Sequence, residues 1–150
     1  MTAKRKRLKP TAKDGMVALR DHVLARAQLA HERYGSDMGL DGLERLLADS
    51  DVVRYPCGIV VDGGALEPGE LAFARQRGEK AADGFDVVVH PNFACDHAAL
   101  PVIVMYQLVV VNYGGIATEE EAELFGATVL GMDKEDYYRK LCALADSLAG

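Results

Sequence analysis

The sequence predicts an α+β fold in which a small, mainly antiparallel three-stranded sheet has two helices before it and three after it. Apolar residues recur at helical spacing up to about residue 48, and short β-rich segments follow between residues 52 and 90. Helical spacing returns after residue 100, in segments bounded by glycines. The 150 residues contain no internal repeat and no long linker, so one domain is expected.

Charge is distributed unevenly along the chain. The formal net charge is −6, and the five basic residues between positions 4 and 9 carry +5, which leaves −11 on the remainder. We therefore predict a basic flexible arm over residues 1–12 and a single α+β domain over residues 13–150. Nucleic-acid binding relies on a continuous basic surface, so the acidic domain argues against such a partner and leaves only residues 4–9 for contact.

Cysteine usage and apolar runs indicate a cytoplasmic protein with no membrane partner. Cys57, Cys95 and Cys142 are odd in number and form no CxxC motif, so free, buried thiols in a reducing compartment are expected. The charges near the N-terminus are not followed by the apolar stretch of a secretory signal. The longest apolar run, residues 100–111, is shorter than the roughly 20 residues that span a bilayer.

Two helices are predicted before the sheet. The first has an apolar stripe at helical spacing that stops before Gly35 and consists of Met16, Leu19, Val23, Ala27, Ala30 and Tyr34. Asp41 and Glu44 have the spacing of a capping box, in which the first side chain bonds a free amide and the second reaches back. This pair predicts a second, short helix over residues 43–48.

Three strands are predicted from the change of period that follows. Residues 52–61 are rich in β-branched side chains and end at the turn signal Asp62-Gly63-Gly64. Residues 66–75 form the second candidate strand, and a proline and a glycine near its start indicate an edge position or a bulge. Residues 85–90 form the third strand, which a proline closes.

Three helices are predicted after the sheet. Residues 101–113 are ambiguous, because their valines favour a strand whereas their length and Gly-Gly terminus favour a buried helix; we favour the helix. Thr118 and Glu121 form another capping box, which starts a helix that runs to Leu130. Asp133 is placed to cap the last helix. The apolar stripe of that helix consists of Tyr137, Leu141, Leu144 and Leu148.

A polar cluster after the third strand is the first candidate site. Imidazole, thiolate and carboxylate groups all bind zinc. The cluster contains them at His90, Cys95, Asp96 and His97. Its spacing matches no standard zinc finger, and a second interpretation has Asp96 capping a helix, Cys95 packing as a small hydrophobe and the histidines in a loop.

The segment EEEAELFGATVLG, residues 119–131, suggests a second candidate. It resembles the second conserved helix of ImmA/IrrE-type zinc metallopeptidases, E-x-E-A-N-x-F-A-A-x-L-L, in which the glutamate before the alanine is the third zinc ligand. That glutamate matches Glu121, and Ala122 and Phe125 match the alanine and phenylalanine. The family also has helices and a three-stranded sheet before its metal-binding helix, an order similar to the one predicted here.

In that family the metal-binding helix carries H-E-x-x-H, and the resemblance places residues 101–113 in its position. Tyr106 and Val110 then occupy the positions of the two histidines, and Gln107 occupies the position of the catalytic glutamate. Neither tyrosine nor valine supplies an imidazole, and an amide accepts no proton from zinc-bound water. The resemblance therefore implies a degenerate, zincin-like site without zinc or peptidase activity, in which Gln107 hydrogen-bonds within the core.

No motif in the sequence supplies a complete set of catalytic groups. GxSxG, GxGxxG and GxxxxGK[ST] are all absent. We therefore predict a non-catalytic module without a cofactor, which binds a protein partner or itself as a homodimer, and the six tyrosines agree with an interface. The alternative is a metal-dependent, peptidase-like hydrolase in which zinc is bound by His90, Asp96, His97 and Glu121.

Overall fold

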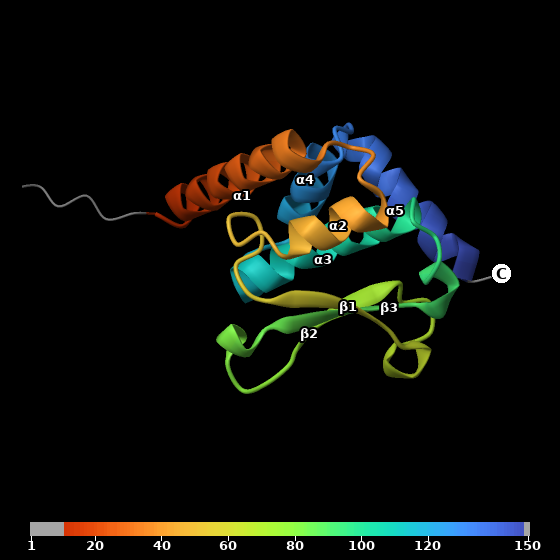
Figure 1. Cartoon of the computed structure of the whole chain (residues 1–150). Coiled ribbons are helices and arrows are strands. Elements are labelled where there is room, and N and C mark those ends of the chain that lie inside the picture. The colour runs from red at the N-terminus through yellow and green to blue at the C-terminus, as the bar shows by residue number, and fades with distance from the viewer. Residues whose placement is uncertain (1–10, 149–150) are drawn as a thin grey trace, which may run out of the picture.

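The computed structural model describes residues 11–148 and contains five helices and a three-stranded sheet (Figure 1). The elements, in order, are α1 (Ala12–Tyr34), α2 (Gly39–Leu47), β1 (Cys57–Val61), β2 (Ala72–Gln76), β3 (Phe85–Val89), α3 (Ala99–Tyr113), α4 (Glu119–Val129) and α5 (Lys134–Leu148). The predicted α+β class is confirmed, with two helices before the sheet and three after it. Residues 1–10 of the predicted arm lie outside the described residues, and α1 begins at Ala12.

The sheet is mixed, whereas a mainly antiparallel one was expected. Its strand order is β1-β3-β2, with β1 parallel to β3 and β2 antiparallel to β3. The first strand begins at Cys57 and not at residue 52, because the backbone N–H groups of Val52 and Val53 donate to the Asp49 carbonyl in a turn. The second strand is confirmed at an edge of the sheet, although it begins only at Ala72.

The second helix begins earlier than the capping box predicts. Helix α2 starts at Gly39, so Asp41 lies inside its first turn and does not cap it. Asp41 instead pairs with Arg45 one turn later, with 3.7 Å between the carboxylate and the guanidinium. Acidic side chains stabilise the first turn of a helix through its dipole as well as through caps, which explains why the same residue suits both positions.

Helix α3 is the central element, and the helical interpretation of residues 101–113 is confirmed. Eleven of its 15 residues are buried, between the sheet on one side and α4, α5 and α2 on the others (Figure 1). A helix satisfies its own backbone hydrogen bonds, which suits a segment enclosed on most sides. By length and composition alone, residues 99–116 would cross a bilayer, but 61% of that stretch is buried inside the protein, as expected of a core helix.

Two buried polar side chains attach α3 to its surroundings. The side-chain oxygen of Asn112 accepts from the Arg54 N–H at 2.8 Å, and its amide donates to the Val52 carbonyl at 2.9 Å. The hydroxyl of Tyr137, on α5, donates to the Val102 carbonyl of α3 at 2.6 Å. Tyr137 has no exposed surface, so this bond satisfies a polar group that burial would otherwise leave unpaired.

The ring of Tyr137 also explains a glycine in α4. A Cβ added at Gly126 would overlap this ring, so α4 and α5 approach each other closely only because residue 126 has no side chain. We expect Gly126→Ala to lower the free energy of unfolding by about 1–3 kcal/mol, despite the better helix propensity of alanine. Urea unfolding followed by circular dichroism measures the change.

Gly115→Ala is the matched control for this substitution. A Cβ at Gly115 meets no heavy atom within 4 Å, so its stability should differ little from that of the wild type. Equal stability of the two variants would show that the contact between Gly126 and Tyr137 does not limit packing.

Candidate functional site

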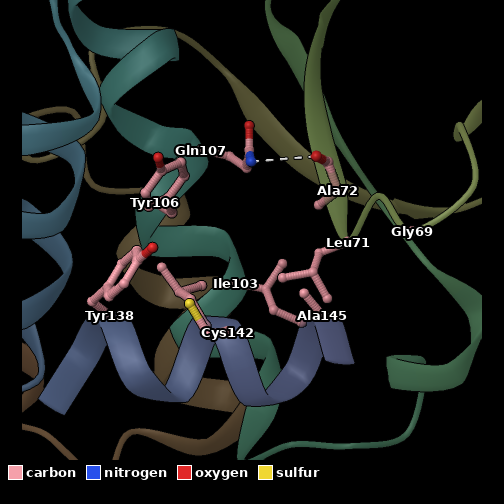
Figure 2. A pocket seen from close by; sticks show the side chains of 10 residues that line it. Gly69, Leu71, Ala72, Ile103, Tyr106, Gln107, Tyr138, Cys142 and Ala145 are labelled. Carbon is pink, nitrogen blue, oxygen red and sulfur yellow. Dashed lines mark hydrogen bonds between the residues drawn. The ribbon is translucent and has the colours of Figure 1, made fainter. Parts of the chain in front are cut away.

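An apolar groove of about 280 Å³ opens between α3, α5 and the start of β2 (Figure 2). We call it the α3–α5 groove. Its lining is formed by Gly69, Leu71, Ala72, Ile103, Tyr106, Gln107, Tyr138, Leu141, Cys142 and Ala145. These side chains are aliphatic, phenolic or neutral polar, and no carboxylate, imidazole or cationic group is among them.

Helical periodicity places the lining residues. Ile103, Tyr106 and Gln107 are spaced three and four residues apart, so they share one face of α3. Tyr138, Leu141, Cys142 and Ala145 share one face of α5 by the same spacing. Figure 2 shows the two faces turned toward each other, with β2 beside them.

Gln107 connects α3 to β2 at the margin of the groove. Its side-chain amide donates to the carbonyl of Ala72, with 3.3 Å between nitrogen and oxygen (Figure 2). The expectation that Gln107 hydrogen-bonds within the protein is confirmed. Amide–carbonyl bonds are usually about 2.9–3.0 Å long, so this bond is longer than most.

The outer edge of β2 lies next to this bond. The Leu71 carbonyl accepts from the His90 N–H, and the Arg77 N–H donates to the Gly84 carbonyl, each at 2.9 Å. Antiparallel pairing alternates, so residues 72, 74 and 76 direct their backbone N–H and C=O groups away from β3. Within residues 11–148 no strand lies beyond β2, and Gln107 covers only the carbonyl of residue 72.

The two phenols of the groove stay protonated at neutral pH. Burial raises the pKa of Tyr106, and the nearby Glu119 and Glu123 carboxylates raise it further. The pKa of Tyr138 is raised first by its hydrogen bond with the Cys142 thiol. The groove therefore presents neutral hydrogen-bonding groups beside a negatively charged helix start.

Two of the predicted zinc ligands after β3, His90 and Asp96, have other hydrogen-bonding roles. The ring nitrogen Nδ1 of His90 accepts from the Asn92 N–H at 3.1 Å. The Asp96 carboxylate accepts from the Ala99 N–H at 3.0 Å, which is the helix cap that the second interpretation predicts. His97 is exposed and lines a separate depression beside Lys140. Within residues 11–148, no three His, Cys, Asp or Glu side chains are grouped as metal ligands.

Glu121, the fourth predicted ligand, is only 4% exposed and lies at the start of α4. Burial acts to raise its pKa, but hydrogen bonds from the Thr118 hydroxyl and from the backbone N–H groups of both residues outweigh it and lower the pKa. Only half of the predicted capping box forms, because the Thr118 side chain makes no bond to the helix N–H groups. The resemblance pairs Tyr106 with Glu121 as counterparts of two zinc ligands, but the carboxylates that act on Tyr106 are those of Glu119 and Glu123.

The sequence alone did not identify the groove. The groove face of α5 lies beside the apolar stripe that the sequence predicts for this helix and shares only Leu141 with it. Apolar periodicity therefore did not indicate the groove face, and Tyr138 on that face is 54% exposed. The three cysteines are unpaired, as expected. None is fully buried, however, and Cys95 is exposed and not packed as a small hydrophobe.

The thiols should differ in reactivity. Burial raises the pKa of Cys57 to about 11, so at about pH 8 only about 0.1% of this thiol is the reactive thiolate. We expect iodoacetamide to label Cys95 first and Cys57 last, as measured by peptide mass spectrometry. Because the thiolate fraction of Cys57 grows about tenfold per pH unit below its pKa, its labelling rate should rise accordingly from about pH 8 to 9.

Unfolding in urea provides the control, since it should make the three labelling rates similar. If Cys57 reacted as fast as Cys95 in the folded protein, its raised pKa would be refuted.

Comparison of the chain with protein-family models, with curated proteins and with solved structures finds no match. The function is therefore inferred from the groove and from the strand edge beside it.

Proposed function

We propose that the chain is a non-catalytic protein-interaction module. It binds an extended segment of a protein along the outer edge of β2 and receives one apolar side chain in the α3–α5 groove. The observation that carries this proposal is the position of an apolar groove directly beside a strand edge that no strand covers. In strand addition, backbone hydrogen bonds supply affinity and an adjacent pocket supplies specificity.

The chemistry of the groove favours binding over turnover. General acid–base catalysis needs a group that exchanges protons near neutral pH. The raised pKa of the two phenols moves them further from that range, and the amide of Gln107 has no accessible proton equilibrium. The Gln107 amide does suit a backbone, because it offers both a donor and an acceptor beside the strand edge.

The proposal also accommodates the resemblance to ImmA/IrrE-type metallopeptidases. Tyr106 and Gln107, which occupy positions of the family motif, both line the groove. A chain that descends from such an enzyme and has lost its metal ligands would retain a place for a peptide without the means to cleave it. We propose that this chain is a degenerate form of that kind.

Selection from a phage-displayed random peptide library tests the proposal. We expect enriched peptides that carry an apolar residue at one recurring position. Ala74→Pro removes an outward N–H at the strand edge, and Ala145→Phe fills the groove, so each should weaken peptide binding at least tenfold. Isothermal titration measures the affinities, with circular dichroism to confirm that the variants fold.

Ala143→Phe is the matched control, because Ala143 lies on α5 outside the groove lining and is exposed. It should leave peptide affinity unchanged. The proposal is wrong if no peptide is enriched or if neither groove nor edge variant weakens binding. Stoichiometric zinc that is lost on His90→Ala or His97→Ala, with the fold intact, would instead support the hydrolase alternative.

A further inference from the structure

We propose that the segment bound in the α3–α5 groove is the basic arm of a second copy of this chain, with Leu8 as the inserted side chain. This inference rests on the proposed function, since it names the occupant of the same site. The basic stretch of the arm reads KRKRLK over residues 4–9, and Leu8 is the only apolar residue within that stretch. Charge, sequence pattern and reach support this choice.

Acidic residues border the groove on two sides. Glu119 and Glu123 of α4 act electrostatically on the Tyr106 phenol. On the β2 side, Glu67 and Glu70 flank Gly69 of the lining, and their turn is closed by a bond of 3.2 Å from the Glu67 N–H to the Glu70 carboxylate. A strongly basic segment is complementary to this border, whereas an acidic one would be repelled.

The arginines near the groove already have acidic partners. Arg75 and Arg77 contact the Asp86 carboxylate at 3.7 Å and 2.9 Å. Arg139 contacts Glu135 at 3.6 Å and Asp136 at 3.5 Å. These pairs offset the positive charge of the three arginines, which leaves Lys134 beside Glu123 as a remaining cation near the groove. Within residues 11–148, Glu67, Glu70, Glu119 and Glu123 form no ion pair, so their carboxylates are available to a basic segment.

The residue pattern of the arm suits strand addition. In an extended segment alternate side chains point to opposite faces, so Leu8 shares a face with Lys6 and Lys4. Leu8 would then enter the apolar groove while the lysines meet carboxylates at its border. Pro10 follows Lys9 and lacks a backbone N–H, so a ladder of backbone hydrogen bonds would end there.

The arm of the same chain does not reach this groove. Helix α1 packs on α4, α4 packs on α3, and α3 covers the sheet, so α1 and β2 lie on opposite sides of the molecule (Figure 1). Helix axes in contact are about 8–10 Å apart, which separates α1 from the groove by roughly 20 Å. The three residues between Leu8 and Ala12 allow at most about 14 Å when extended.

The direction of α1 increases this separation. Arg20 pairs with Glu120 at 3.7 Å and the His31 ring bonds the Val129 carbonyl at 2.9 Å, so α1 and α4 run parallel. Arg20 is therefore level with the start of α4, and the eight residues from Ala12 to Arg20 extend about 12 Å beyond it. Because the arm leaves from that projecting end, the groove it fits belongs to another copy.

Complementation between two full-length variants tests the inference by sedimentation equilibrium at about 50 mM NaCl. Leu8→Asp replaces the inserted apolar side chain with a charged one and leaves the groove unchanged. Ala145→Phe fills the groove and leaves the arm unchanged. We expect the wild type to dimerise and each variant to associate at least tenfold more weakly. A mixture of the two should associate more strongly than either variant alone, because one arm and one groove remain usable.

Ala143→Phe should dimerise as the wild type does, and about 500 mM NaCl should weaken the wild-type dimer at least tenfold. The inference is overturned if the wild type is monomeric at about 100 µM. It is also overturned if Ala145→Phe dimerises normally or if the mixture gains nothing over its components.

A fluorescent peptide of residues 1–12 separates this inference from the proposed function. It should bind full-length Leu8→Asp and fail to bind Ala145→Phe. If library peptides bind the groove while this peptide does not, the second-copy inference is wrong and the proposed function stands. If neither kind of peptide binds, both are wrong.

Discussion

The enclosure of α3 is the constraint on which the rest of the structure depends. A helix that is buried on nearly every side must satisfy its own backbone and find a partner for each polar side chain it carries. Asn112 does this through the loop before β1, Gln107 through the edge of β2, and the Val102 carbonyl receives the Tyr137 hydroxyl. These bonds hold the loop, the sheet and α5 around α3. The burial of this helix and the positions of its neighbours therefore depend on each other.

The same arrangement creates the groove. Helix α5 is anchored to α3 through the buried Tyr137, and Gly126 lets α4 approach that ring. Farther along α5 the facing residues are small, and Ala145 and Ala72 do not fill the space between helix and strand. The groove is thus what remains when close packing at one end of α5 is combined with short side chains at the other.

The charge pattern around the groove is the basis of the selectivity that we propose for it. Its lining is neutral at neutral pH, while carboxylates of α4 and of the loop before β2 stand at its border. An apolar residue with cationic neighbours fits such a site better than a wholly apolar or an acidic segment does. The uneven charge of the chain, +5 in the arm and −11 in the remainder, supplies both halves of that complementarity within one sequence.

The sequence by itself determined the class of fold and the order of its elements, because these depend on local periodicity. It left two interpretations open for the start of the second strand and for Asp96, and the structure selects the edge position and the cap. The sequence failed for Asp41 and for residues 52–56, where local preferences permit two outcomes and packing selects one. Only the tertiary structure decided the groove, because its walls come from the loop before β2, from β2 itself and from two helices that are distant in sequence. No local pattern encodes which helix faces meet, since that is set by how α3 is enclosed.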